Sequence, residues 1–482
     1  MQSRGFTRRG FLKSAAFAVV GVIAAACQPK IVEVTREVEK VVKETVVVAG
    51  TPEVVEKVVK ETVVVKEEVT RAVAPTPGPK LTLWGPKHFI EAQNDYFTDS
   101  ALLSAANNNF EVDVQLFPWG DYGTKQNVAI EAGTMPDVFL GGMGFVRQYV
   151  MGVQADVSDL YAEIDEQGGG FYPGNESIVT FKGKQYGVPF HNEPQFMYYR
   201  KDLFSEKGFE APPKDADEFL QACVAITDAP NQIWGFGNAI AECPDGNTGF
   251  RMWVNAFGGR IQDEAGNIVI NSPESLEGIK FFCDLYSKHK IMPPGASGWD
   301  DTGNNKAYLS GQCAAIFNTA SVLNNMREED PGWLEGTVLG PVPGPQPTTF
   351  TGGSIFHIVA ASPYPELGAE LIRGIMAPDR YPNNLRTAGG FMFPTMYKYE
   401  KDPFFADDPY NQMIAATSQY ALHDFAPGDP VPWMSVIGDN NLWAQMSTRV
   451  AVEAWDPQEA LDDFEKQCIA AKKDYEEKGL VV

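Results

Sequence analysis

The sequence predicts an α/β body that follows an export signal and a low-complexity stalk. Three observations lead to this prediction. The first 26 residues are basic and then apolar, residues 31–80 repeat one segment and contain no aromatic residue, and from Lys80 onward strand and helix patterns alternate. Strands that alternate with helices favour parallel βαβ units and an open sheet.

Composition excludes several classes of protein. The 482 residues include 39 Lys and Arg against 63 Asp and Glu, a formal net charge of −24. A nucleic-acid partner is therefore not expected, because neutralising phosphates requires a basic surface. The only sustained apolar run, Phe17–Ala26, is shorter than the ~20 residues of a membrane span, which argues against a polytopic membrane protein.

Residues 1–26 have the pattern of a signal peptide. Arg8 and Arg9 lie side by side within Thr7–Lys13, a run that resembles the twin-arginine export motif. Three alanines then precede Cys27 and resemble a lipobox, which implies that Cys27 is lipidated and anchors the protein to the outer face of the cytoplasmic membrane, at the cell surface or in the periplasm. The alternative is plain cleavage nearby, with Cys27 an incidental small residue.

Residues 27–79 are predicted to be a spacer. The segment Val38–Val48 recurs identically as Val55–Val65, but two copies are too few for a solenoid. Valines at spacings of three and four residues would permit an oligomerising coiled coil, and a simple tether is the alternative. The proline-rich run Pro75–Pro79 ends the segment as a stiff linker.

The body begins with a βαβαβ pattern. Leu81–Trp84 and Val112–Phe117 are predicted strands with a helix across Glu91–Asn109 between them, and Pro136–Leu140 is a third strand after a second helix. Further along, Ser272 is predicted to cap a helix that has proline at its first position.

The remaining predicted elements are a strand at Trp234–Gly237, which Asn238 follows, buried strands at Cys313–Phe317 and Ser354–Val359, and a last amphipathic helix from Pro457. Two such α/β units fill the rest of the chain.

No motif in the body predicts catalysis. The five histidines have no metal-ligand spacing, and no nucleophile elbow, phosphate-binding loop or EF-hand loop is present. We therefore expect no enzyme, no cofactor and no metal. With Cys27 assigned to lipid, five cysteines remain, four of them in apolar or helical patterns, and we expect no obligatory disulfide; these four are Cys223, Cys283, Cys313 and Cys468.

A set of short motifs in order along the body carries a family resemblance. The most distinctive are Gly183–Pro189 and Met197–Gly208, and weaker ones follow at Gly133–Phe139, Trp234–Gly237, Ser272–Gly278, Leu309–Ala315, Gly389–Pro394 and Pro457–Leu461. Together they resemble the extracellular solute-binding proteins of family 1, the group that contains the maltodextrin-binding protein. The resemblance covers nearly all of residues 80–482.

The resemblance implies a two-lobe fold of the periplasmic-binding-protein type II. Lobe 1 would comprise residues 80–193 plus 351–395, and lobe 2 residues 194–350 plus 396–482. Strands would cross between the lobes near residues 190–197, 345–351 and 395–402. A membrane permease of the ABC transporter class would be the partner, and the body would be monomeric.

Ligand-binding residues are expected just after strands, where open α/β sheets bind ligands. Glu193 aligns with an acidic sugar-contacting position of the family, whereas Ser321 stands where the maltodextrin binder stacks a Trp, which puts a maltodextrin ligand in doubt. Trp84, Trp253, Trp299 and Trp433 lie in loop or turn contexts and could serve as aromatic platforms, with packing as the alternative role for each Trp and for His88. Trp443 and Trp455 lie in helical patterns and are assigned to the core. The candidates are Trp84, His88, Phe145, Asn192, Glu193, Asn238, Trp253, Trp299, Asn318, Ser321, Gly353, Phe391 and Trp433.

The predicted function is capture of a sugar or related polyol between two closing lobes, for delivery to an ABC importer. Aromatic faces, carboxylates and amides suit the apolar face and hydroxyl rim of a sugar. The alternatives are a tethered extracellular glycosidase, a binding protein for a polyamine or peptide, and an interaction protein that oligomerises through the stalk.

Overall fold

The computed structural model describes residues 30–48, 51–69, 78–88, 90–142, 146–329, 331–417 and 420–480. It divides the chain into two compact units, Met1–Thr76 and Pro77–Val482. The predictions for Arg8, Arg9, Cys27 and Phe145 lie outside the described residues.

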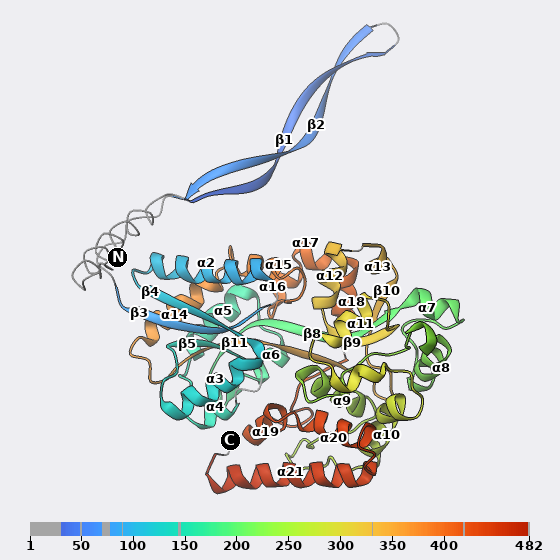
Figure 1. Ribbon diagram of the computed structural model, residues 1–482. Coiled ribbons are helices and arrows are strands. Elements are labelled where there is room, and N and C mark those ends of the chain that lie inside the picture. The colour runs from blue at the N-terminus through green and yellow to red at the C-terminus, as the bar shows by residue number, and fades with distance from the viewer. Residues whose placement is uncertain are drawn as a thin grey trace, which may run out of the picture. The chain divides into compact units, whose positions relative to one another are not determined.

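The first unit contains a long antiparallel hairpin where a spacer was predicted. Strands β1 (Lys30–Val48) and β2 (Thr51–Val69) pair from Lys30 opposite Val69 to Val48 opposite Thr51 (Figure 1). The alternative prediction of a helical coiled coil in this segment is therefore wrong. Valine-rich segments favour strands over helices because the branched β-carbon restricts the side chain in a helix.

The second unit, which we call the body, begins with the predicted βαβαβ pattern. Strands β3 (Lys80–Lys87), β4 (Glu111–Pro118) and β5 (Val138–Gly142) are parallel, and β3 lies between the other two. Helices α2 (Glu91–Asn107) and α3 (Trp119–Ala132) connect them and lie on opposite sides of the sheet (Figure 1). These elements confirm the prediction.

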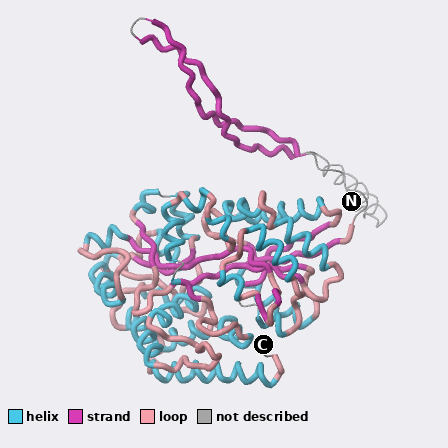
Figure 2. The backbone as a smooth tube through the Cα atoms, turned by 180° about the vertical axis from the view of Figure 1, so that it is seen from behind, coloured by secondary structure: helices cyan, strands magenta, loops and turns pink. Residues whose placement is uncertain are grey.

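A long strand, β8 (Val188–Arg200), continues the sheet into the second half of the body. Its first half pairs with β11 (Thr349–Ile358), which also pairs with β5, and its second half pairs with β9 (Ala315–Thr319) and β10 (Thr337–Gly340). The strands form one band across the body (Figure 2), and β8 is the strand whose two halves take different partners.

The other elements cover this band. The short strands are β6 (Thr180–Phe181), β7 (Lys184–Gln185) and β12 (Ala421–Leu422). The helices up to β10 are α4 (Val146–Val150), α5 (Ser158–Gly168), α6 (Pro173–Ser177), α7 (Lys201–Glu206), α8 (Ala216–Ile226), η1 (Ala229–Asn231), α9 (Pro244–Ala256), α10 (Pro273–Ser287), η2 (Pro294–Gly298), α11 (Gly303–Leu309), α12 (Ser321–Glu329) and α13 (Pro331–Glu335). Those after β11 are α14 (Pro365–Ile375), α15 (Tyr381–Thr387), α16 (Tyr397–Glu400), α17 (Pro403–Ala406), α18 (Pro409–Thr417), η4 (Pro432–Met434), α19 (Ser435–Asp439), α20 (Leu442–Ala451) and α21 (Pro457–Glu477).

Several local predictions are confirmed. The Ser272 side chain accepts a hydrogen bond from the Ser275 N–H and caps α10, as the motif with proline at N1 indicates. Trp443 is buried in the core. The four cysteines in apolar patterns, Cys223, Cys283, Cys313 and Cys468, are buried.

Three local predictions are wrong. Trp455 was placed in a helical pattern but precedes α21, outside any helix; it is half-buried, packs against the core and lies against the Arg449 guanidinium. The segment Trp234–Gly237 makes only isolated bridges to Cys313 and Ile316, so it is not a strand. A strand was expected near residues 395–402, but the short helix α16 (Tyr397–Glu400) occupies the middle of this range.

No helix in the described part of the chain is long and apolar enough to span a membrane.

Candidate functional site

Three consecutive polar residues occupy the middle of β8, where the strand changes partners. Asn192 pairs with Gly353 and Glu193 with Gly352 on β11, and Gln195 already pairs with Thr319 on β9. Gly353 has a φ of 151°, a conformation that favours glycine. At about 3.3 Å per residue, only some 7 Å of strand separates Glu193 from the first residue paired with β9.

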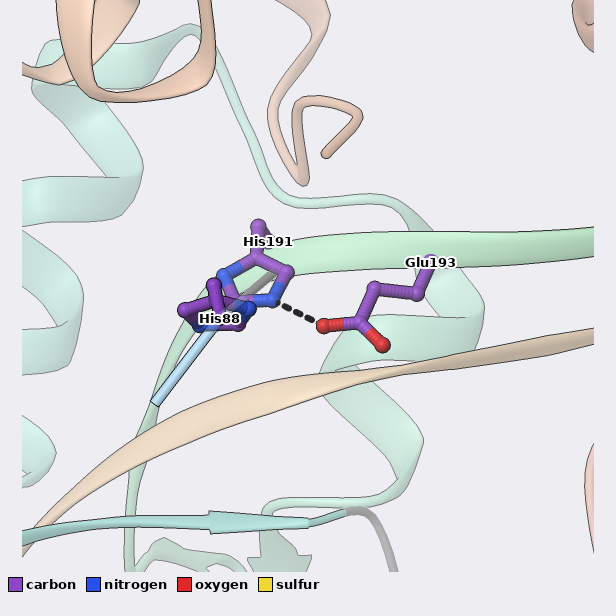
Figure 3. A group of neighbouring side chains, drawn as sticks. All are labelled: His88, His191 and Glu193. Carbon is purple, nitrogen blue, oxygen red and sulfur yellow. Dashed lines mark hydrogen bonds and ion pairs between the residues drawn. The ribbon is translucent and has the colours of Figure 1, made fainter. Parts of the chain in front are cut away.

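His88, His191 and Glu193 form a buried group, which we call the histidine cluster (Figure 3). The Nε2 atom of His191 lies 2.7 Å from Oε1 of Glu193, and one nitrogen or oxygen from each residue lies within 4.8 Å of the others. The His88 and His191 rings meet edge to face, with centroids 5.5 Å apart. The structure therefore brings together two predicted site residues, His88 and Glu193, with one that was not predicted.

Backbone and sheet contacts fix the two histidines. His88 follows β3, and its backbone N–H donates to Oδ1 of Asn94 on α2 while the Asn94 amide donates back to the His88 carbonyl. His191 lies within the paired half of β8 opposite Ser354. Hydrogen bonds to α2 and to β11 thus fix the backbones of both histidines.

Burial governs the ionisation of the cluster. Desolvation lowers the pKa of His88 to about 4, with the Glu193 charge opposing this and His191 adding to it. Burial alone would raise the pKa of Glu193, but the hydrogen bond from His191 and the electrostatic influence of the two neighbouring imidazoles outweigh it and lower the pKa. At neutral pH the cluster consequently holds a neutral His88 beside a carboxylate.

Aromatic rings lie next to the cluster. Phe391 and Trp119 lie with their ring centroids 6.2 Å and 6.1 Å from that of His88. Phe391 was a predicted site residue and is buried, whereas Trp119, 37% exposed, was not predicted. Trp119 begins α3 directly after β4, so the rule that ligands bind after strands could have found it.

Asn192 has a structural role in the described residues. Its side chain donates to the carbonyl of Pro394 and exchanges hydrogen bonds with the Asn175 amide. Its backbone pairs with Phe393. Asn192 therefore fastens the loop that carries Phe391 to β8.

A second polar group lies at the end of β9, which we call the amide–carboxylate cluster. The Asn318 amide donates to Asn305 at 2.5 Å and to Asp245 at 3.3 Å, and the Asn304 amide donates to the same Asp245 oxygen at 3.0 Å. Burial, and then the neighbouring Asp301 charge, raise the pKa of Asp245 to about 7.

Ser321 begins α12 beside this cluster and hydrogen-bonds Thr319 at 2.9 Å. Asn318 and Ser321 are thus brought together as predicted, and Asp245 is the residue that the sequence did not single out.

Other predicted site residues lie apart from both clusters or are packed. Trp84 lies under Lys125, 4.5 Å from ring centroid to Nζ, and both line a surface pocket of about 380 Å³. Trp299 is half-buried after η2 and packs against Gly303. Asn238 is fully buried and donates to the Ala239 carbonyl.

Two of the predicted aromatic platforms are core residues. Trp253 was assigned to a loop but lies in α9, fully buried against Phe219, Phe236 and Phe281. Trp433 lies in η4 and is only 4% exposed. A platform role for Trp253 is wrong, because its ring has no free face.

The comparison with protein families decides the assignment. A family model described as bacterial extracellular solute-binding protein matches residues 101–412. The chain belongs to this family. The matched range includes β8, β9, β11, the amide–carboxylate cluster and two of the three residues of the histidine cluster, His191 and Glu193; His88 precedes it. The extracellular solute-binding family resemblance found in the sequence is therefore confirmed.

Individual relatives are distant. A Brucella abortus protein named only as a binding protein is 26% identical over 252 residues, covering 52% of this chain and 60% of that protein. The chain thus spans about 60% of the length of the first curated relatives it matches. A maltotriose-binding protein of Pyrococcus abyssi is 23% identical over 330 residues, covering 66% of this chain and 68% of the relative.

Solved structures share the fold. One is an ABC transporter solute-binding protein from Thermotoga lettingae, solved with bound α-D-tagatose. Its TM-score is 0.71 at 24% identity, and the match covers 82% of this chain and 100% of that chain. This similarity confirms the two-lobe α/β fold predicted for the body of this solute-binding protein.

Proposed function

We propose that the protein binds a neutral sugar or polyol outside the cell and delivers it to an ABC importer. The observation that carries this proposal is the position of Glu193. It is a buried carboxylate in the middle of β8, beside the residue at which the pairing of β8 with β11 ends and its pairing with β9 begins. A solute held there would contact residues from both halves of the body.

The lobe boundaries follow the pairing of β8. We assign residues 80–193 plus 351–395 to lobe 1 and residues 194–350 plus 396–482 to lobe 2, with β8 and β11 as connecting strands. The histidine cluster then belongs to lobe 1 and the amide–carboxylate cluster to lobe 2. A solute touching both clusters favours the closed form by its difference in affinity for the two forms.

The chemistry of the two clusters suits hydroxyl groups. Carboxylate and amide oxygens accept hydrogen bonds from hydroxyls, amide N–H groups donate to them, and aromatic rings such as Trp119 cover the apolar face of a sugar. The net charge of −24 disfavours anionic solutes. A maltotriose-binding relative and a tagatose-bound structural neighbour support the same class of solute.

The N-terminal region serves attachment in this proposal. The twin-arginine motif with Arg8 and Arg9 directs export, Cys27 carries the lipid, and the hairpin β1–β2 lies between Cys27 and the monomeric body in the sequence. Two acyl chains on one cysteine suffice for stable anchoring. The importer is then a separate membrane protein that recognises the closed form.

The test is thermal unfolding of the full chain against a panel of sugars, polyols, amino acids and polyamines. A solute present at 100 times its dissociation constant stabilises the folded protein by about 2.7 kcal/mol. We expect a dose-dependent shift with one class of sugar or polyol, recovered unchanged. A shift with amines alone, or none with any sugar or polyol, would contradict the proposal.

A tethered glycosidase is the second candidate, and one observation favours it. Asp245, whose pKa is raised to about 7, lies beside Asp301, whose carboxylate accepts the Asp245 N–H. Glycoside hydrolysis uses a carboxyl group with a raised pKa as the acid and a second carboxylate across the scissile bond, and Asp245 has the raised pKa of the first group. Release of the aglycone from an aryl glycoside, lost in Asp245→Asn, would establish this candidate in place of simple binding.

A further inference from the structure

We propose that the histidine cluster binds a divalent transition-metal ion, of which Zn²⁺ fits the donor set best. The cluster offers one nitrogen from His88, one from His191 and a carboxylate oxygen from Glu193. Two imidazoles and a carboxylate form a donor set that Zn²⁺ binds well, whereas Ca²⁺ and Mg²⁺ prefer oxygen donors. This inference goes beyond solute binding and holds whether or not the solute is a sugar.

The spacing of the donor atoms fits a single ion. Zinc binds imidazole nitrogen and carboxylate oxygen at about 2.1 Å, which sets the ligand atoms of a tetrahedral site roughly 3.4 Å apart. In the cluster the three donor atoms lie within 4.8 Å of one another, with His191 Nε2 and Glu193 Oε1 at 2.7 Å. Small side-chain adjustments bring all three to the required distance.

The hydrogen bonding of the two histidines points to a ligand. Neither His88 ring nitrogen has a hydrogen-bond partner among the described residues, although His88 is only 6% exposed. The Nδ1 atom of fully buried His191 likewise has none. Buried polar atoms are normally paired, because leaving one unpaired costs about 1–3 kcal/mol. A metal ion would use the His88 nitrogen that faces Glu193.

The elements around the cluster supply the rigidity that a metal site needs. His88 is held at its backbone by Asn94, and His191 and Glu193 lie on one face of β8, two residues apart. Figure 3 shows the His88 ring beside His191 and the Glu193 carboxylate turned toward His191. Rigid elements keep donor atoms near their bonding positions before the ion arrives.

Three protein ligands leave at least one coordination position open. In zinc sites of this type the open position holds water or a bound molecule. At that position an ion held by the histidine cluster would bind a solute oxygen atom directly. The cluster is thus a candidate for a metal-assisted solute site as well as a metal site.

The test measures metal binding in the absence of any solute. The full chain, treated with chelator and dialysed, is titrated with Zn²⁺ in competition with a chromophoric chelator, and separately with Co²⁺ while its visible absorption is recorded. We expect one Zn²⁺ per chain and a Co²⁺ spectrum of a four- or five-coordinate nitrogen and oxygen site. Absence of stoichiometric Zn²⁺ binding, or an octahedral hexaaquo-like Co²⁺ spectrum, would overturn the proposal.

Variants locate the ion. His88→Gln and Glu193→Gln each remove one donor, and we expect each to weaken Zn²⁺ binding at least tenfold. The matched control is His289→Gln, since His289 follows α10 and lies outside the cluster, and it should bind Zn²⁺ as the unmodified chain does. Equal binding by all three variants would contradict the assignment.

A folding control keeps the outcome readable. Each variant is first shown by circular dichroism and thermal unfolding to be folded. If His88→Gln does not fold, the Co²⁺ spectrum of Glu193→Gln decides, because loss of the carboxylate alters the spectrum only if the ion is bound there. Because no solute is present, failure of this test leaves the solute-binding proposal standing, and failure of the solute panel leaves this one standing.

Discussion

Replacing Asp245 with Asn should stabilise the protein above neutral pH. Asp245 lies in the first turn of α9 and accepts hydrogen bonds from Asn304 and Asn318. Its burial, reinforced by the Asp301 charge, raises its pKa from 3.8 to about 7. The asparagine keeps an acceptor oxygen for the two amides and removes the buried charge.

The sign and size of the effect follow from the raised pKa. Between pH 4 and pH 7 the folded protein holds a proton on Asp245 that the unfolded chain has released, so stability falls as pH rises through this window and levels off above it. A rise of roughly three pKa units at about 1.4 kcal/mol each sets an upper limit of about 4 kcal/mol. Asp245→Asn lacks this loss, so its advantage over the unmodified chain grows from pH 4 to pH 7.

The assay is thermal unfolding of both proteins at half-unit steps from pH 4 to pH 8.5. The matched control is Glu242→Gln, because Glu242 is an exposed carboxylate three residues earlier. The difference in melting temperature between Asp245→Asn and the unmodified chain should rise from pH 4 to pH 7 and level off above pH 7, and that of the control should stay constant. A difference that is flat, or that grows toward low pH, would refute the argument.

Three further substitutions test the packing. Trp253→Ala should destabilise the fold by about 3–5 kcal/mol, because a fully buried indole leaves a cavity; a loss below 1 kcal/mol in chemical denaturation would contradict its core position. Ser272→Ala should cost about 1 kcal/mol through the lost cap of α10, and Ser272→Asp should restore it in the same assay. Gly235→Ala should lower the melting temperature more than Ser272→Ala or Ser272→Asp does, because the added Cβ would lie 2.4 Å from the Cys223 Cα. An unchanged melting temperature would contradict this close contact between Gly235 and the Cys223 backbone.

Local patterns predicted the first half of the sheet well. The strands beginning at Lys80 and Glu111 and the helix from Glu91 need only hydrophobic spacing and the βαβ rule, which depend on neighbours in sequence. The cap at Ser272 is also local. Such features can be predicted from the sequence because the residues that define them lie within a few positions of one another.

Tertiary contacts account for the failures. Trp253 was assigned to a loop, although Phe250, Val254 and Phe257 mark the same helical face, and the glycines before it masked that spacing. The hairpin of the first unit pairs two copies of one repeat, an arrangement that a search for helical periodicity does not consider.

The histidine cluster could be predicted only in part. Glu193 was found through the family alignment and His88 through its place after a strand, but His191 was not selected as a site residue. His88 follows β3 and His191 lies in β8, about 100 residues later. Only the arrangement of β3 and β8 in the folded sheet places the two histidines together. Searches based on ligand spacing find metal sites within one helix or loop and miss sites of this kind.

The most direct test of solute binding at β8 is calorimetric titration of the full chain with the sugar or polyol that the thermal panel identifies. The unmodified chain should bind one equivalent and release it unchanged. Glu193→Gln should bind about 10–100 times more weakly, since a hydrogen bond to a buried charge contributes about 1.5–3 kcal/mol, while His289→Gln should match the unmodified chain. Equal affinity for Glu193→Gln would contradict a site at the middle of β8.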